Sequence, residues 1–237
     1  MKLTQPDDLT VRLVQAEKPA DVVRAGAACL ARLLGGFGWV RSRQSLERRE
    51  AGRREVIQLE KSKWNRSESL IKFTVTSLTV FDEGLGAWRR ANPELTVGRP
   101  EPVESIVCAT SFLDMSRQYF VVLTRPEDRP ARLEQFAAHL RETALPWFAA
   151  TADPDQAAPA APDALLTAWG FAQDLFEFLV STGHHAQARM LWERVQKQNP
   201  THQHLFAAGR AMAETGQRPR WHTPEALGWS ASVLELM

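Results

Sequence analysis

Two stretches of the chain repeat apolar residues at intervals of three and four, which is the spacing of one helical face. The first is Pro19–Leu34, and the glycines that follow it, Gly35 and Gly36, are typical helix stops. The second is residues 129–149, where Pro146 can end or kink the helix. The pattern predicts a helix over each of these ranges.

Between the two helices, apolar residues recur at every second position, as in strands with one buried face. Five stretches follow this pattern: residues 39–49, 53–61, 70–80, 103–112 and 118–124. Gly52 separates the first two and can adopt the positive φ of a hairpin loop. Because the strands are short and follow one another directly, we expect an antiparallel meander rather than βαβ winding.

The predicted fold class is therefore α+β, with an antiparallel sheet of about five strands packed with two helices and followed by an all-α tail. The core of this domain should lie between the sheet and the helices. We expect it to contain Ile57, Leu59, Phe73, Val75, Leu133, Phe136 and Leu140.

The pattern divides the chain into an α+β domain over residues 1–150, a linker over residues 151–162 and a helical tail over residues 163–237. The linker is rich in Ala and Pro. The tail has tetratricopeptide-like spacing at Gly183, Ala188, Trp192, Val195, Pro200, Gly209 and Gly216. About one and a half repeats fit, and stacked repeats usually need about three or more. We therefore expect the tail to dock on the first domain, on a second copy or on a partner.

The composition is that of an ordinary globular chain. Of the 237 residues, 44% are hydrophobic and 24% are charged, and the formal net charge of +1 gives no general attraction to nucleic acid or anionic membranes. The two cysteines, Cys29 and Cys108, exclude a disulfide scaffold and a four-cysteine zinc site. The start of the chain has no apolar signal core, and no apolar run approaches the ~20 residues of a membrane helix. We expect a cytoplasmic protein with no membrane partner.

A specific motif stands at the end of the second predicted strand. Residues 56–65 read Val-Ile-Gln-Leu-Glu-Lys-Ser-Lys-Trp-Asn, and a strand with Phe73-Thr74-Val75-Thr76 follows. Together with Gly-Phe-Gly-Trp at 36–39 and Leu-Pro-Trp at 145–147, this resembles the bacterial domain-of-unknown-function family 4304 over roughly residues 20–150. The resemblance implies the α+β fold and no established reaction. It is consistent with an accessory or immunity-type protein that acts beside a toxin.

The most distinctive charge pattern lies in the hairpin of residues 41–66, which carries nine Lys or Arg against four Glu. Its candidate binding residues are Arg48, Arg49, Arg53, Arg54, Lys61, Lys63 and Trp64. A basic ribbon with an aromatic can contact phosphates and stack a base, and the same charges suit an acidic protein. The alternative is a solvated face whose cations deter edge pairing. The exposure of the Trp64 side chain distinguishes these hypotheses. A structural role predicts a buried indole, and a binding role predicts an exposed one.

Catalytic motifs are missing from the sequence. It has no Gly-x-Ser-x-Gly, His-Glu-x-x-His or phosphate loop. In one class of metal-dependent nucleases a lysine follows a metal-binding carboxylate by two positions, but two positions after Glu60 this chain has Ser62. Four tail histidines, His184, His185, His202 and His204, lack a carboxylate or thiolate ligand at a metal-site spacing. We assign no catalytic, cofactor or metal residue.

The favoured function is non-enzymatic binding of a protein partner, which can be a toxin, an effector or a second copy of the chain. The alternative is a nucleic-acid-binding module that uses the hairpin of residues 41–66, and the third hypothesis is an enzyme with a hidden site.

Overall fold

The structure of the protein is a computed structural model, and it describes residues 8–66, 69–97, 105–110 and 119–237. The chain forms two compact units, each built from three segments. The first unit contains Met1–Arg49, Glu55–Leu78 and Leu113–Pro146. The second unit contains Glu50–Arg54, Thr79–Phe112 and Trp147–Met237.

Six strands form one sheet: β1 (Gly38–Val40), β2 (Ser45–Glu50), β3 (Arg53–Lys61), β4 (Lys72–Asp82), β5 (Ser105–Thr110) and β6 (Phe120–Val122). Strands β1 to β5 are neighbours in chain order, and β6 pairs with β4 outside this path. The β1–β2 and β4–β6 pairs are antiparallel. The predicted α+β class with an antiparallel sheet and a helical C-terminal region is confirmed.

The helices are α1 (Asp8–Gln15), α2 (Pro19–Leu34), α3 (Glu83–Ala91), α4 (Arg129–Ala152), α5 (Pro154–Ala160), α6 (Asp163–Leu166), α7 (Trp169–Ser181), α8 (His185–Gln198), α9 (Gln203–Glu214) and α10 (Pro224–Val233). Short 3-10 turns occur at Pro93–Leu95, Pro126–Asp128 and Pro200–His202. Helix α2 has the bounds predicted from the sequence. No helix in the described ranges is both long enough and apolar enough to cross a bilayer.

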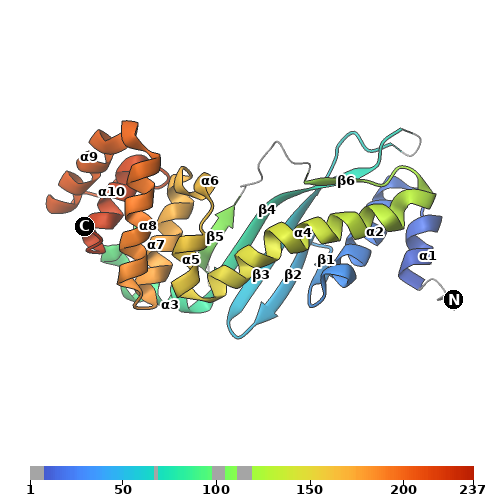
Figure 1. Cartoon of the computed structure of the whole chain (residues 1–237), viewed down its shortest axis with the longest axis horizontal. Helices are drawn as coiled ribbons and strands as arrows, with labels where there is room; N and C mark the ends of the chain where they lie inside the picture. The colour runs from blue at the N-terminus through green and yellow to red at the C-terminus, as the bar shows by residue number, and fades with distance from the viewer. Residues whose placement is uncertain (1–7, 67–68, 98–104, 111–118) are drawn as a thin grey trace. The chain divides into compact units, whose positions relative to one another are not determined.

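The core of the first unit is centred on Phe73 of β4, which is fully buried. On one side its ring meets Phe136 of α4 edge to face, with 6.2 Å between the centroids. Gly26 of α2 approaches the same ring so closely that a Cβ there would lie 3.2 Å from Phe73 Cε1 and 2.8 Å from Leu123 Cδ1. Helices α2 and α4 therefore cover the same face of β4 (Figure 1). The seven core residues predicted from the sequence are all buried.

Arg129 connects three segments of the first unit, and its side chain is buried, with 2% of the residue exposed. Its guanidinium donates hydrogen bonds to backbone carbonyl oxygens only: those of Leu13, Val14, Ala16, Leu123 and Thr124. Three of these carbonyls lie at the C-terminal end of α1, where unpaired carbonyls concentrate partial negative charge. The start of α4 is thereby bonded to the end of α1 and to the chain after β6.

The second unit is organised around α7, which is buried along most of its length. It packs against α3, β5, α8 and α10. The tail aromatics meet one another in the interior, since Trp192 makes edge-to-face ring contacts with Phe176 and Phe206. The helical tail therefore docks on α3 and β5, which come from earlier in the chain, and the predicted boundary at residue 150 does not separate the compact units.

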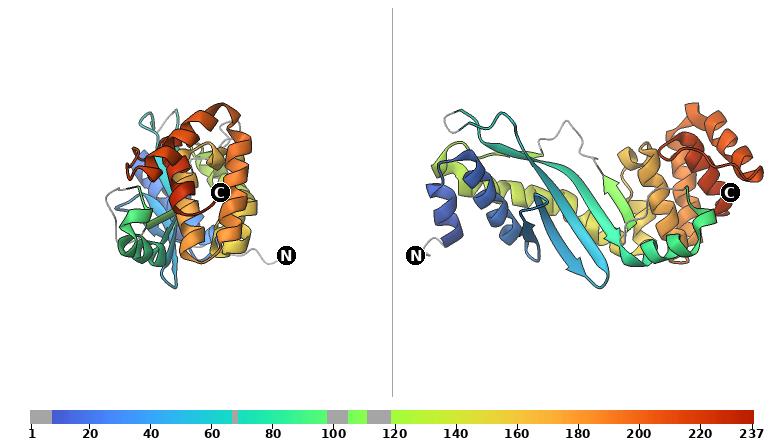
Figure 2. Two further views of the ribbon diagram at one scale, coloured as in Figure 1. Left: turned by 90° about the vertical axis from the view of Figure 1, so that its left-hand side faces the viewer. Right: turned by 180° about the vertical axis from the view of Figure 1, so that it is seen from behind.

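Helices α9 and α10 lie side by side because two glycines let their backbones touch (Figures 1 and 2). A Cβ on Gly209 would collide with the carbonyl oxygen of Glu225, and a Cβ on Gly228 would collide with that of Phe206. Any larger residue at either position must push the helices apart. Glycine in the middle of a helix is unfavourable by itself, so its presence here reflects the close crossing.

Two sequence predictions are corrected by the structure. The single strand expected at residues 39–49 is broken into β1 and β2 by a turn at residues 41–44, in which Gln44 adopts a left-handed φ of 51°. Alternating polar residues in this stretch are compatible with both a strand and a turn, so the pattern could not locate the reversal.

The linker predicted at residues 151–162 is also different, because α5 occupies most of it. Asp153 caps this helix by accepting a hydrogen bond from the Asp155 N–H at 3.0 Å, and Pro154 stands at its first position. Its alanines Ala157 and Ala158 are fully buried. Ala/Pro-rich composition suits a linker, yet small side chains also permit a helix to pack closely. Helix α4 covers the predicted range of residues 129–149 and continues to Ala152, so Pro146 does not end it.

Candidate binding site at the end of the basic hairpin

The basic residues at the tip of the β2–β3 hairpin bind parts of the chain itself. Arg53 donates hydrogen bonds to the carbonyl oxygens of Phe148 and Thr151, each at 2.7 Å, so it caps the C-terminal end of α4. The guanidinium of Arg54 lies 3.9 Å from the centroid of the Phe81 ring. These two candidates therefore contribute to the packing of the second unit.

Arg48, in the middle of β2, is also held inside the hairpin. It donates to Glu55 of β3 at 2.7 Å from Nε, and its guanidinium carbon lies 5.0 Å from the centroid of the Phe37 ring. Arg49 follows it and is exposed at the strand end. The cross-strand pair joins opposite charges on neighbouring strands, which stabilises a hairpin and neutralises Arg48.

Lys61, Lys63 and Trp64 lie at the opposite end of β3 and are exposed. Lys61 is the last residue of β3, and Arg53 at the tip is the first. The indole of Trp64 is 63% exposed, and the Lys63 ammonium lies 5.2 Å from its ring centroid. This is the exposure that the binding hypothesis predicts. It differs from the buried indole that a structural role requires.

Hydrogen bonds between side chains and backbone hold the segment that carries Trp64. Ser62 Oγ accepts a hydrogen bond from the Trp64 N–H at 3.2 Å. The Asn65 side chain bridges to the first residue of β4, since it donates to the Lys72 carbonyl at 2.8 Å and accepts from the Lys72 N–H at 3.0 Å. Residues 62–65 are therefore held in place by hydrogen bonds while the Trp64 ring stays in solvent.

The turn at residues 41–44 brings a further cation to this end of the sheet. Gln58 of β3 holds the turn by donating from Nε2 to the carbonyls of Arg43 at 2.8 Å and Gln44 at 3.2 Å. The Leu59 N–H donates to the same Gln44 carbonyl at 2.9 Å. Gln44 is thereby fixed in its left-handed conformation, and Arg41 lies at the start of the turn.

A cavity of about 260 Å³ opens where this turn, the end of β3 and α2 meet. Its lining combines three cations with apolar walls and one amide: Ala20, Val23, Arg24, Trp39, Arg41, Gln44 and Lys61. The indole nitrogen of Trp39 is buried and has no hydrogen-bond partner in the described part of the chain. Arg24 lies 3.4 Å from Asp21 on the same helix, with both side chains about half exposed.

This lining can bind anionic groups. Three cations converge, and the unpaired indole N–H can donate to an oxygen acceptor such as a carboxylate or a phosphate. The lining contains no carboxylate, histidine or cysteine. Within the described ranges, no group of three or more His, Cys, Asp or Glu is arranged to hold a metal ion.

The sequence pointed to Lys61, Lys63 and Trp64, counted Arg41 only among the cations of the hairpin, and did not point to Arg24 or Trp39 as parts of a site. Arg24 lies on a different element, and its position in the sequence of α2 is that of an ordinary surface residue. The tertiary structure brings it beside Lys61 and separates Arg53 and Arg54 from the group. Comparison of the chain with protein-family models, with curated proteins and with solved structures finds no match. The resemblance to family 4304 therefore stays a prediction.

Proposed function

We propose that this chain is a binding protein that holds an acidic surface of a protein partner at the end of β3, with Trp64 as the anchor. The observation that carries the proposal is the 63% exposure of an indole on a loop pinned by its neighbours. Tryptophan buries a large area without losing many rotamers, and it is enriched among the residues that dominate protein interfaces. Lys61 and Lys63 beside it supply positive charge that can pair with acidic residues around the anchor site on the partner.

A protein partner is favoured over nucleic acid because the basic residues do not form one continuous track. Arg48 is paired with Glu55, and Arg53 and Arg54 are engaged with Phe148 and Phe81. Non-specific nucleic-acid affinity depends on several cations that each meet a phosphate. An interface hot spot needs one well-placed aromatic and few charges.

Within this class, the resemblance to family 4304 points to a toxin or effector as the partner. The chain would then act by occupying a surface of that protein. The cationic cavity beside Lys61 suits a carboxylate side chain of the partner, because its donors include both guanidinium groups and the Trp39 indole N–H.

The test compares four full-length proteins: wild type, Trp64→Ala, a Lys61→Glu/Lys63→Glu double variant, and Trp221→Ala as a matched control. Trp221 is also an exposed tryptophan, and it lies in the second unit. Each protein captures partners from nuclease-treated extract of the source cells. Each is also titrated against polyglutamate and against a single-stranded oligonucleotide in a salt series.

The proposal predicts a protein partner that is captured by wild type and by Trp221→Ala and is lost from both hairpin variants. Polyglutamate should bind weakly, with an affinity that falls as salt rises. If the oligonucleotide binds more tightly than polyglutamate and loses affinity on Trp64→Ala, the nucleic-acid hypothesis replaces this one. Equal capture by all four proteins removes the hairpin from any binding role.

A further inference from the structure

Strand β6 has one edge that points away from its partner. The Val75 N–H donates to the Tyr119 carbonyl at 2.8 Å and the Leu123 N–H donates to the Ile71 carbonyl at 2.7 Å, so residues 119, 121 and 123 direct their backbone groups to β4. In an antiparallel ladder the residues between them face the other way. The N–H and C=O groups of Phe120 and Val122 therefore point outward. In the described part of the chain, β6 pairs with β4 alone.

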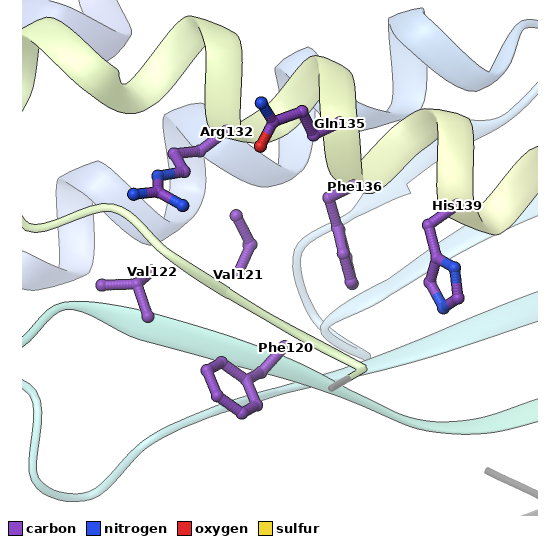
Figure 3. Close-up of a pocket in the computed structure, with 7 residues that line it drawn as sticks. All are labelled: Phe120, Val121, Val122, Arg132, Gln135, Phe136 and His139. Atoms are coloured by element: carbon purple, nitrogen blue, oxygen red, sulfur yellow. The ribbon is translucent and has the colours of Figure 1, made fainter. Parts of the chain in front are cut away.

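A groove follows this outward edge between β6 and α4. Its first cavity, of about 220 Å³, is shown in Figure 3 and is lined by Phe120, Val121, Val122, Arg132, Gln135, Phe136 and His139. A second cavity, of about 540 Å³, shares Val122 and Arg132 with the first and continues toward Ser69 and Arg125. The Val122 side chain is 36% exposed. The groove thus combines an apolar floor with an open row of backbone donors and acceptors.

The length of the helical wall matches the length of the strand edge. Arg132, Gln135 and His139 lie on one face of α4 at spacings of three and four (Figure 3). At about 1.5 Å per residue they span roughly 10 Å along the helix. Three strand residues at about 3.3 Å each cover the same distance. The row of polar side chains on α4 is therefore as long as the open edge of β6.

The charge of the groove is predominantly positive. Arg125 and Arg132 line it, and neither forms an ion pair within the described ranges. The Lys72 ammonium adds a third cation, 4.8 Å from the centroid of the Phe120 ring. Asp128 is the one carboxylate among the lining residues of the two cavities. An occupant with negative charge complements this groove.

We propose that the groove binds an extended acidic peptide segment, which adds to the sheet as a strand along the outward edge of β6. The backbone of the peptide pairs with the N–H and C=O groups of Phe120 and Val122. One acidic side chain of the peptide meets Arg132, and an apolar side chain enters the cavity lined by Phe120 and Phe136. Strand addition gives hydrogen-bond partners to the outward N–H and C=O groups of β6. The positive charges of the groove favour an acidic peptide over other extended peptides. This surface is distinct from the loop of Trp64, and the inference stands without the proposed function.

The test titrates the full-length chain with the peptide acetyl-Glu-Val-Glu-Leu-Glu-Val-amide by calorimetry. Two control peptides accompany it: one with Lys in place of every Glu, and one with alternate backbone amides methylated so that it cannot pair as a strand. Free glutamate and inorganic phosphate serve as small anionic probes. Amide hydrogen exchange of residues 119–124 is measured with and without the peptide.

Three variants of the chain complete the design. Val122→Pro removes an outward N–H that β4 does not use, and an edge position tolerates proline. Arg132→Glu reverses the central charge of the groove. Lys197→Glu is the matched control, since it reverses an exposed cation on α8 in the second unit. Thermal melts show whether each variant is folded, and the methylated peptide keeps the test valid if Val122→Pro is not.

The proposal predicts that the acidic peptide binds and that both control peptides bind at least about tenfold more weakly. Val122→Pro should weaken binding about fivefold, which corresponds to one hydrogen bond, and Arg132→Glu about tenfold or more. Lys197→Glu should leave the affinity unchanged, and exchange at Phe120 and Val122 should slow in the complex. If the methylated peptide binds as well as the parent, strand addition is wrong. If only glutamate or phosphate binds, or no probe binds at millimolar concentration, the groove is not a peptide site.

Discussion

Among the residues that the structure describes, each unit contains one buried arginine, and the two guanidinium groups are held by different kinds of acceptor. Arg129 in the first unit and Arg89 in the second are both 2% exposed. Within the described ranges, all acceptors of Arg129 are backbone carbonyls, at distances of 2.8–3.5 Å. Arg89 donates to two buried carboxylates, Glu177 at 2.5 Å from Nε and Asp174 at 2.9 Å.

The difference appears in the direction of each pKa. Burial lowers the pKa of Arg129, and the charge of Glu127 offsets this only in part. Burial also lowers the pKa of Arg89, but the carboxylates of Glu177 and Asp174 outweigh it and raise the pKa above its ordinary value. Because the folded pKa of Arg89 is raised, its stabilising contribution is fully present below the ordinary pKa of arginine and is lost only as the pH rises through the folded value. Both groups are cations at neutral pH.

A buried arginine can thus serve as a clamp on the backbone, as Arg129 does, or as a counterion for other side chains, as Arg89 does. When the clamp is removed, neutral carbonyls lose donors. When the counterion is removed, two carboxylates stay buried without their cation. The free-energy cost of removal should therefore differ, although the two arginines are equally buried.

The largest effect is expected from Arg89→Met, which leaves Asp174 and Glu177 without their shared cation. It should lower the free energy of unfolding by about 3–5 kcal/mol. Urea denaturation measures the loss, and hydrogen exchange should rise in α3 and α7. Adding Asp174→Leu and Glu177→Met to the same chain should recover most of it, because apolar replacement of a whole buried charge cluster is often tolerated. A loss below about 1 kcal/mol for the single variant would contradict the counterion role.

Arg129→Met should have the next largest effect, about 2–3 kcal/mol, because hydrogen bonds from a charged donor are lost but no charge is stranded. Hydrogen exchange should rise at the C-terminal end of α1, where three of the accepting carbonyls lie. Arg129→Lys should restore part of the stability, since an ammonium has donors but not the planar fork. A cost equal to that of Arg89→Met would erase the distinction between the two arginines.

The second unit also depends on backbone contact, which Gly209→Ala tests. The added methyl group on α9 must push away α10, which carries the Glu225 carbonyl, at a cost of about 1–3 kcal/mol, while the helix propensity of alanine returns up to about 1 kcal/mol. Ala208→Ser on the exposed side of the same helix is the control and should be nearly neutral. Thermal melts compare the two variants. An unchanged melting temperature for Gly209→Ala would show that the helices separate freely.

The smallest effect on stability is expected at Trp64. Its ring lies in solvent, so Trp64→Ala should change the free energy of unfolding by less than about 0.5 kcal/mol. Trp192→Ala is the matched comparison, because this tryptophan is buried against Phe176 and Phe206 and its loss should cost about 3–5 kcal/mol. Denaturant midpoints measure both. A large loss of stability at Trp64 would assign it to the fold instead of to binding.

The sequence by itself determined the bounds of several elements and the identity of the core residues predicted for β3, β4 and α4. Helical spacing gave α2 its bounds at Pro19–Leu34, and alternation with Gly52 before it located β3 at Arg53–Lys61. The predicted core residues of β3, β4 and α4 are buried. These features depend on the period of apolar residues along one element, which the sequence contains in full. The exposed end of β3 with Lys61, Lys63 and Trp64 could be proposed from the same stretch, because cations and an aromatic stand together in the chain.

Only the tertiary structure decided which distant residues meet. The ion pairs of Arg89 join residues that are more than eighty positions apart, and Arg24 reaches the cavity of Lys61 from another element. The same structure divides the basic hairpin, since Arg53 and Arg54 belong to the second unit and Lys61 to the first. Contacts of this kind depend on where the chain reverses, and the turn that ends in Gln44 has no distinct signal in the pattern. Charge density along a sequence therefore becomes a binding surface only where the fold brings the charges together and leaves them unpaired.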